Sequence, residues 1–352
     1  MPGFVLLCSE GEMHNLAKKI VDRLNALRPN DPDLKLSHIN YSYWRDGEFN
    51  DKIPKFADIR GKHVVFFMAS HYNELVLQGL QLIWAIKYQY GAKTLTVVMP
   101  FMAYRRQDHA EKPKEIQRNL WFLGSLKQNG VDNLIVCDAH SEQTTINGLS
   151  VDLNMVNVDP TSAFAAALGD ILAEPKINNQ PIYVFAPDKG SLTRAVRLAK
   201  FLDVLVLFKP KERLANGQVN ISAELTPETM LIVENIQAAN NVSIVWQQYE
   251  SALNGALVII RDDELDTGRT AAGNARWCLS LGAEQVIFAV THTCCSPGWR
   301  EEVADPDATP FKRILAGDTI YRPYRNGTDG LIRNVDMSKV LAEALAKLMA
   351  TN

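Results

Sequence analysis

Short runs of apolar residues alternate along the chain with amphipathic stretches that have helical spacing. The apolar runs, several of them rich in β-branched residues, cover residues 63–67, 94–99, 133–137, 182–185, 204–208, 256–260 and 285–290. Uninterrupted runs of this length are typical of strands buried on both faces. The stretches between them predict helices at 14–27, 74–90, 114–127, 162–172, 191–202 and 270–281. Strand and helix in alternation predict an α/β fold with parallel sheets that are covered by helices on both faces.

The chain is long enough for two ordinary domains, because its 352 residues are 47% hydrophobic and can supply two cores. The sequence changes character near 156–164, where a turn-like Asp-Pro pair starts a new helix. We therefore expect an N-terminal domain at 1–155 and a C-terminal domain at 156–335. A last helix within 336–352 can pack back onto the first domain.

Charge and hydropathy argue against nucleic-acid and membrane partners. The net charge is −3, from 37 basic and 40 acidic residues, and gives no general attraction for polyanions or membrane surfaces. No apolar run approaches the roughly 18 to 20 residues that span a bilayer, and the N-terminus does not resemble a signal peptide. The sequence predicts a cytoplasmic protein. Its five cysteines have no C-x-x-C spacing, so reduced thiols are expected, with a redox role for Cys294 and Cys295 as the alternative.

The stretch VIIRDDELDTGRTAAG, residues 258–273, joins a predicted strand to a predicted helix. The strand is expected to end at Arg261 and the helix to begin near Thr270, which places an acidic loop at the carboxyl edge of a parallel sheet. Open α/β sheets bind ligands at that edge. Main-chain N–H groups at the helix start, close approach at Gly268 and the hydroxyls of Thr267 and Thr270 favour a phosphate site.

The carboxylates before this loop need a different partner, because Asp262, Asp263 and Asp266 cannot contact a phosphate without repulsion. They can accept hydrogen bonds from sugar hydroxyls or bind Mg²⁺. A ribose phosphate satisfies both halves of the stretch, whereas the alternative is an acidic, solvated turn that only caps a helix. The candidate ribose-phosphate site comprises Asp262, Asp263, Asp266, Thr267, Gly268, Arg269 and Thr270.

The segment DDELDTGRT (262–270) resembles the ribose-phosphate loop shared by phosphoribosyltransferases and by ribose-phosphate pyrophosphokinases, also called phosphoribosyl pyrophosphate synthetases. Further segments resemble synthetase motifs in the same order: YWRDGEF (43–49), YRRQDHAEK (104–112), CDAHSEQ (137–143), APDKGSLTRA (186–195), KER (211–213) and AVTH (289–292). Transferases are not expected to carry the segments at 104–112, 137–143 and 186–195. The resemblance covers nearly the whole chain and implies two tandem phosphoribosyltransferase-like domains, each a mainly parallel sheet flanked by helices.

The resemblance also implies roles for individual residues. Transfer of a diphosphoryl group spreads negative charge over oxygens, so catalysis depends on positioning and cations. Lys211 and Arg213, two residues apart, are the implied catalytic pair; solvated surface cations are the alternative. His140 and Asp188 are the implied metal ligands, and oxygen-rich ligation around phosphates favours Mg²⁺. The implied ATP-binding residues are Trp44, Asp46, Glu48, Arg106, Gln107, Asp108 and His140.

The loop around Trp44 is the weakest of these matches, and a surface β-turn is its alternative. An aromatic face there can stack on adenine, while nearby acceptors meet the amino group of the base. In the family this loop reaches the site of a neighbouring subunit. The resemblance therefore implies a homo-oligomer, a dimer or a hexamer.

The implied reaction is Mg²⁺-dependent transfer of the diphosphate group of ATP to the anomeric 1-hydroxyl of ribose 5-phosphate, giving phosphoribosyl pyrophosphate, a precursor in nucleotide biosynthesis, and AMP. Two departures from the family leave the acceptor open: Arg269 stands where synthetases generally have Gly, and the segment 214–255 is longer than expected. ADP-ribose, with an extended 5-phosphate, is the alternative acceptor. Two other interpretations are a phosphoribosyltransferase and a non-catalytic regulatory relative of the synthetase.

Overall fold

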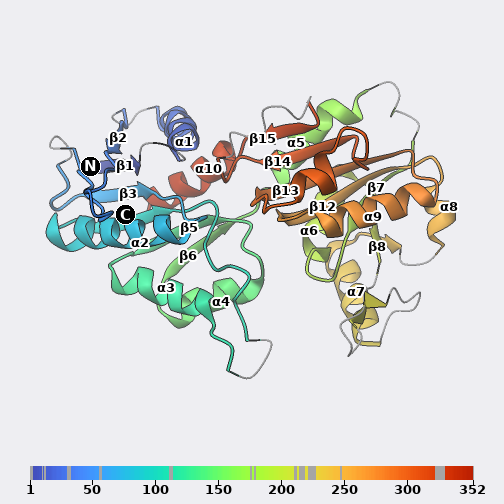
Figure 1. Ribbon diagram of the computed structural model, residues 1–352, viewed down its shortest axis with the longest axis horizontal. Coiled ribbons are helices and arrows are strands. Elements are labelled where there is room, and N and C mark those ends of the chain that lie inside the picture. Colours follow the sequence, from blue (N-terminus) through green and yellow to red (C-terminus); the bar gives the residue numbers. More distant parts are fainter. Residues whose placement is uncertain are drawn as a thin grey trace. The chain divides into compact units, whose positions relative to one another are not determined.

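The computed structural model describes residues 3–9, 11, 13–29, 33–54, 58–110, 114–174, 177, 180–209, 212–213, 219–220, 227–245, 248–321 and 330–351. The chain divides into two compact units (Figure 1). The first unit comprises Met1–Pro160, Asp318–Tyr321 and Asp336–Asn352, and the second comprises Thr161–Gly317 and Arg322–Val335. Among the helices of the described residues, none is long and apolar enough to cross a membrane.

The first unit is built on a six-stranded sheet with the order β2-β1-β3-β4-β5-β6, and every pairing in it is parallel. Its strands are β1 (Phe4–Ser9), β2 (Leu36–Ile39), β3 (His63–Phe67), β4 (Thr94–Val98), β5 (Asn133–Cys137) and β6 (Asn154–Val158). Its helices are α1 (His14–Leu27), α2 (Asn73–Trp84), which continues as η1 (Ala85–Gln89), α3 (Arg118–Gln128), α4 (Glu142–Ser150) and α10 (Ser338–Met349).

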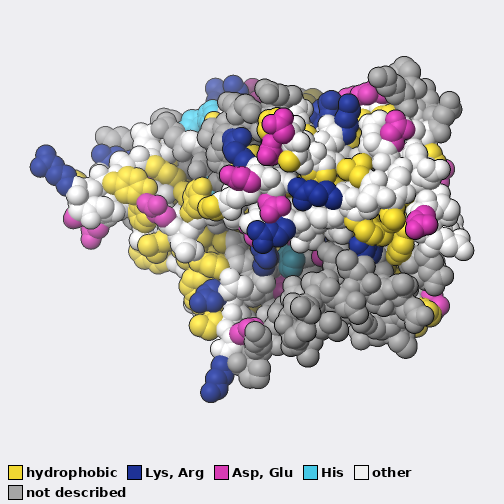
Figure 2. All heavy atoms as spheres, turned by 45° about the vertical axis from the view of Figure 1, so that its right-hand side comes forward, with side chains coloured by type: hydrophobic (Ala, Val, Ile, Leu, Met, Phe, Trp, Pro, Cys, Tyr) yellow, Lys and Arg dark blue, Asp and Glu magenta, His cyan; other side chains and the backbone are white. Residues whose placement is uncertain are grey.

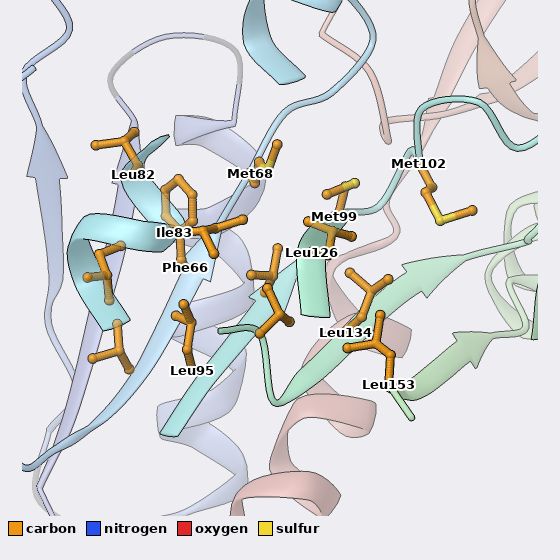
Figure 3. Packing of buried hydrophobic residues seen from close by; sticks show 14 of the residues in the cluster. Phe66, Met68, Leu82, Ile83, Leu95, Met99, Met102, Leu126, Leu134 and Leu153 are labelled. Atoms are coloured by element: carbon orange, nitrogen blue, oxygen red, sulfur yellow. The ribbon is translucent and has the colours of Figure 1, made fainter. Parts of the chain in front are cut away.

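Side chains of β3, β4 and β5 interlock with α2 and α3 in the core of this unit (Figure 3). Phe66 from β3, Leu95 from β4 and Leu134 from β5 pack with Ile83 from α2 and Leu126 from α3, and all are fully buried. The terminal helix α10 packs against α1 and also contacts β5 and β6. Residues from the two ends of the sequence thus pack together in one unit.

The second unit contains a seven-stranded sheet with the order β11-β8-β7-β12-β13-β14-β15, again with parallel pairings. Its strands are β7 (Ile182–Ala186), β8 (Leu205–Phe208), β11 (Ile244–Val245), β12 (Leu257–Leu265), β13 (Gln285–Thr293), β14 (Arg313–Gly317) and β15 (Ile332–Val335). A separate antiparallel pair joins β9 (Glu212–Arg213) and β10 (Val219–Asn220). The helices are α5 (Thr161–Leu172), α6 (Leu192–Leu202), α7 (Pro227–Asn240), α8 (Tyr249–Leu253), α9 (Arg269–Ser280) and η2 (Arg300–Ala304).

The predicted α/β class with parallel sheets is confirmed, and each predicted strand is present. Three predicted ends are wrong by three residues or more. The strand predicted at 285–290 continues to Thr293 as part of β13. The strand that was expected to end at Arg261 continues to Leu265, because its main chain stays paired with β13. The helix that was expected from 114 begins at Arg118, because Lys114 has φ +72° and Gln117 is not helical.

Removal of apolar contacts from α10 is expected to destabilise the first unit. Leu345 is fully buried, so Leu345→Ala should lower the free energy of unfolding by about 2–5 kcal/mol through lost burial and a residual cavity. The exposed residue Lys347 on the same helix supplies the control Lys347→Ala, which should stay within about 0.5 kcal/mol of the parent protein. Denaturant titration followed by circular dichroism measures both. Equal stability of the two variants would contradict docking of α10 on this core.

Candidate functional site

Strand β12 extends past one of its neighbours at the carboxyl edge of the second unit's sheet. In the described part of the chain, β7 pairs with β12 only as far as Ile260, and β14 pairs with β13 only as far as Val290. The β12–β13 pairing continues to Leu265 and Thr293. Beyond the body of the sheet, these two strands form a two-stranded ribbon, and this ribbon carries Asp262 and Asp263.

Two carboxylates, those of Asp263 and Asp188, act on the charge of Asp262 at the base of this ribbon. Burial raises the pKa of Asp262 well above the ordinary value of an aspartate, and the negative charges of Asp263 and Asp188 raise it further. Asp263 is itself 6% exposed, and its Oδ2 lies 3.7 Å from Nη2 of Arg194 on α6. The ligand-free site therefore disfavours full ionisation, and a bound cation or hydroxyl donors would offset that cost.

Asp188 is held by a tight turn directly after β7. Its Oδ1 accepts a hydrogen bond from the Ser191 main-chain N at 3.0 Å, and the Ser191 hydroxyl donates to the Asp188 carbonyl at 2.8 Å. Arg194 closes the same turn, because its Nη1 donates to the Gly190 carbonyl at 2.9 Å. The sequence identified Asp188 but gave no role to Arg194, although the arginine that comes after the Pro-Asp-x-Gly segment was a usable signal.

The start of α9 has the geometry of an anion cradle. Gly268 precedes the helix with φ +78°, and a Cβ at this position would lie 2.3 Å from Val303 Cγ1 and 2.8 Å from Leu265 Cδ1. Both the backbone angle and the packing require glycine. Thr267 is half-buried and Thr270 is exposed, so hydroxyls flank the main-chain N–H groups of the helix start.

Arg269, the residue that left the acceptor open in the sequence analysis, makes an ion pair at the surface. Its side chain is 81% exposed, and its Nε donates to Glu302 Oε1 on η2 at 3.1 Å. Glu302 also has Oε2 3.9 Å from Nη1 of Arg276. Arg269 and Arg276 therefore share the carboxylate of Glu302 beside the predicted phosphate loop. Asp266, half-buried, completes the loop.

In the first unit, Asp108 points inward. Its side chain is fully buried; its Oδ2 accepts a hydrogen bond from the Ser141 hydroxyl, and its Oδ1 lies 2.6 Å from His109 Nδ1. Asn147 Nδ2 donates to the Asp108 carbonyl at 2.8 Å. This carboxylate thus links the 104–108 segment to Ser141, next in sequence to His140. Neither Ser141 nor Asn147 was identified from the sequence, since neither stands out by type.

The other predicted ATP-binding residues lie nearer the surface. Arg106 and Gln107 are exposed, and Gln107 Oε1 accepts from Arg118 Nη1 at 3.1 Å. His140 is half-buried just before the helix cap Ser141.

The turn that carries Trp44 is closed by main-chain hydrogen bonds. The Trp44 N donates to the Glu48 carbonyl at 2.8 Å, and Asp46 Oδ1 accepts from the Glu48 N at 3.2 Å. Trp44 is 59% exposed. The preceding residue, Tyr43, donates its hydroxyl to Glu74 Oε1 at 3.3 Å. The turn is thereby tied to the start of α2.

The 104–108 segment reaches the same helix end, because the Tyr104 hydroxyl donates to Asn73 Oδ1 at 2.8 Å. Asn73 and Glu74 are neighbours at the start of α2, so this unit brings the Trp44 turn and the 104–108 segment to one place. Lys211 lies outside the described residues, and Arg213 is described only as part of β9.

Metal binding stays a prediction. His140 belongs to the first unit and Asp188 to the second. Among the residues that the structure describes, no three His, Cys, Asp or Glu side chains gather in an arrangement that could hold a metal ion. Any cation here would need further oxygen ligands, such as those of substrate phosphates.

Each of the two α/β units contains a parallel sheet, and in the second unit an acidic strand leads through Gly268 into helix α9. These features define a protein of the phosphoribosyltransferase fold class. Residues 5–122 match the N-terminal domain of ribose phosphate pyrophosphokinase, and residues 158–315 match the phosphoribosyl transferase domain. The chain belongs to the ribose-phosphate pyrophosphokinase family, a family of ribose-phosphate diphosphokinases.

Curated relatives agree with this assignment, and a solved structure has the same fold. The chain is 26% identical to ribose-phosphate pyrophosphokinase 1 of Streptococcus pneumoniae over 90% of this chain and 87% of the relative. It is 27% identical to the ribose-phosphate pyrophosphokinase of Saccharolobus solfataricus, with 89% and 93% covered. The crystal structure of phosphoribosylpyrophosphate synthetase from Mycobacterium smegmatis has the same fold, with a TM-score of 0.75, 19% identity and coverage of 99% and 100%.

Gly268→Ala is expected to damage the anion cradle, because the new Cβ would force Leu265 and Val303 apart. Affinity for ribose 5-phosphate should fall by roughly tenfold or more, as for about 1.4 kcal/mol of lost binding. Isothermal titration calorimetry measures this loss. Gly273→Ala in the same helix is the matched control, since a Cβ there meets nothing within 4 Å. Equal affinities of the two variants would argue against a phosphate at this helix start.

Asp262→Asn should make the ligand-free protein more stable than the parent protein, and this gain should grow as pH rises. An aspartate whose folded pKa is raised contributes stability while it is protonated, and that stability is lost as pH rises from about 3.8 through the raised value. Asparagine stays neutral and can still accept the hydrogen bond from the Asp263 N, which Asp262 Oδ1 accepts at 2.9 Å.

Thermal unfolding between pH 4 and pH 8 measures the difference in Tm between Asp262→Asn and the parent protein. This difference should grow in favour of the variant toward pH 8. Asp307→Asn, at an exposed carboxylate of the same unit, should show no such trend. A difference that shrinks with rising pH would contradict a raised pKa for Asp262.

Proposed function

We propose that this protein transfers the diphosphate group of ATP to the 1-hydroxyl of ribose 5-phosphate in the presence of Mg²⁺. The observation that carries the proposal is the β12–β13 ribbon, which sets Asp262 and Asp263 directly before the Gly268 helix start. The carboxylates accept hydrogen bonds from the ribose hydroxyls, and the residues from Asp266 to Thr270 bind the 5-phosphate. These residue roles rest on the chemistry of the groups and on the resemblance to the family.

The proposed reaction requires little covalent chemistry from the protein itself. The anomeric hydroxyl gives up its proton to solvent, its oxygen forms a bond to the β-phosphorus of ATP, the bond from that phosphorus to the oxygen bridging to the α-phosphorus breaks, and AMP leaves. Lys211 and Arg213 would neutralise charge on the transferred oxygens. Magnesium would lower the charge of the ATP phosphates, and the carboxylate oxygens at Asp188 suit a hard cation.

ATP is assigned to the first unit in this proposal. The Trp44 turn, with Asp46 and Glu48, would receive the adenine, and Arg106 and Gln107 the phosphates, because both segments are tied to the start of α2. Asp108 would act through Ser141 rather than by touching ATP, since its carboxylate is buried. In this scheme residues 1–155 form the ATP domain, 156–335 the ribose-phosphate domain, and 336–352 a terminal helix.

A homo-oligomer, dimer or hexamer, also belongs to the proposal. Hydrophobic side chains are gathered on the surface of the first unit (Figure 2). Leu77, Trp84 and Tyr88, spaced along α2 and η1, are each at least 50% exposed. Clusters of this kind on a surface are typical of contacts between proteins. The cytoplasmic setting expected from the sequence stays a prediction.

Ribose 5-phosphate is the first choice of acceptor and ADP-ribose the second. The second is favoured by Arg269, whose guanidinium lies beside the phosphate loop and could meet another phosphate. Exposed ion pairs contribute only about 0–1 kcal/mol, so exchange of Glu302 for a phosphate would cost little. The first is favoured because Glu302 already neutralises this arginine in the ligand-free protein.

The two remaining interpretations have less support. A phosphoribosyltransferase would not need an ATP domain, yet residues 5–122 match the N-terminal pyrophosphokinase domain. A non-catalytic regulatory relative should lack part of the reactive set, whereas Lys211, Arg213, His140 and Asp188 are all in the sequence.

Purified protein with Mg²⁺ and ATP should form AMP only when a ribose phosphate is added. Mass spectrometry of the products with ribose 5-phosphate or ADP-ribose identifies the acceptor, and the larger kcat/KM decides between them. Lys211→Ala is the control variant and should lower kcat by about 10²–10³ with an unchanged circular dichroism spectrum. Absence of AMP with either sugar would refute the diphosphotransferase, and phosphoribosyl pyrophosphate consumption with a base would establish the transferase.

A further inference from the structure

The strand that carries the two sugar-binding aspartates also buries an arginine. Arg261, directly before Asp262, is 1% exposed and is the largest side chain in the described residues that is almost entirely buried. A guanidinium is always charged, and moving it out of water is costly unless hydrogen bonds and a suitable neighbour replace the solvent. A buried cation at this point in the sheet therefore calls for a specific function.

The contacts of Arg261 join three elements. Its Nη1 donates to the Asp262 carbonyl and reaches the Ala289 carbonyl of β13 at 3.5 Å, while its Nη2 donates to the Thr291 hydroxyl at 2.9 Å. The guanidinium carbon lies 4.5 Å from the ring centroid of Phe164 on α5. Planar donors and stacking on an aromatic ring are properties that lysine lacks. The side chain connects β12 and β13 and rests on a helix.

The contacts of Arg261 lie where strand β12 loses one of its two neighbouring strands. The β7–β12 pairing ends at Ile260, so Arg261 is the first residue of the ribbon that is supported by β13 alone within the described chain. Its hydrogen bonds therefore fix the base of the ribbon where the support of β7 is lost. Thr291, its partner on β13, is fully buried, so water cannot take over that hydrogen bond.

Arg261 acts on the main chain of Asp262 rather than on its carboxylate. Its Nη1 donates to the Asp262 carbonyl oxygen. The groups that shift the pKa of Asp262 are its own burial, Asp263 and Asp188. What Arg261 fixes is the peptide group after Asp262 and, through it, the direction of both carboxylates.

We propose that Arg261 is a positioning residue for the sugar, holding the β12–β13 ribbon so that Asp262 and Asp263 meet the ribose hydroxyls without prior ordering. This inference rests on the proposed binding of a ribose phosphate at this edge. Preorganised acceptors save the entropy of ordering the ribbon when the sugar binds. Loss of the guanidinium should therefore weaken sugar binding selectively.

Steady-state kinetics of Arg261→Met tests the selectivity. Methionine fills the buried space without a charge, and replacement of a buried ion by an apolar side chain is often tolerated by the fold. The KM for ribose 5-phosphate should rise about tenfold, while the KM for ATP stays within about twofold of the parent value. Arg261→Lys should restore little, because one ammonium cannot span the carbonyl and the Thr291 hydroxyl.

A second variant removes the partner in place of the arginine. Thr291→Val deletes one acceptor with little change of shape, so it should raise the same KM less than Arg261→Met does, and the double variant should add little to Arg261→Met. Ile259→Val, on the same face of β12, is the matched control that perturbs packing alone. It should leave both KM values unchanged. If Arg261→Met does not fold, Thr291→Val still tests the role of Arg261.

Hydrogen–deuterium exchange of the ligand-free protein provides a readout that does not depend on activity. Arg261→Met and Thr291→Val should speed amide exchange at Asp262–Leu265 and leave α9 as protected as before. Faster exchange in a protein with no activity on ribose phosphates would sink the proposed function but leave the positioning intact. Unchanged exchange, or equal rises of both KM values, would overturn the role given to Arg261.

Discussion

The carboxylates to which we assign the sugar are held in the second unit by main chain that has lost a neighbouring strand. Strand β12 pairs on both sides as far as Ile260 and only with β13 thereafter in the described residues. Polar side chains of β13 in this ribbon, Thr291 and Thr293 among them, are buried. Burial in turn raises the pKa of Asp262. The site is thus costly in the absence of ligand, which is typical of positions kept for binding.

Much of this fold is predictable from the sequence because central parallel strands are buried on both faces and form uninterrupted apolar runs. Strands β2, β6, β11 and β15 were not predicted; they lie at sheet edges, and β6, with the sequence NMVNV, is mostly exposed or half-buried. Strand β14 was missed although it is central and mostly buried, because its sequence RILAG offers only a short apolar run. Strand β1 is different, since its sequence FVLLCS carries the apolar signal and was identifiable. The early end assigned to β12 has another cause: pairing depends on the neighbouring strand, and a charged residue such as Arg261 hides that pairing.

The candidate site, too, was predictable only in part from the sequence. The spacing from Asp262 to Thr270 places acid and anion cradle at one sheet edge, because that relation is local in sequence. Side-chain direction is not local: Asp108 turns inward to Ser141, and Arg269 reaches Glu302 across a long stretch of chain. Residue type alone would assign both to a ligand. Only the tertiary neighbours show that one carboxylate is buried and one arginine is already paired.

In the proposed function, recognition of the sugar ring and recognition of any group attached beyond its 5-phosphate fall to residues with different energetic constraints. Asp262, Asp263 and Arg261 lie in or beside the packed sheet, where a change of charge or volume alters the fold as well as the site. Arg269 and its ion pair with Glu302 are near solvent, where substitution costs little stability. Under that proposal, acceptor choice can vary at the start of α9 while the geometry at the anomeric carbon stays the same. A cation at position 269 fits this separation, since the exposed helix start accommodates it without disturbing the ribbon.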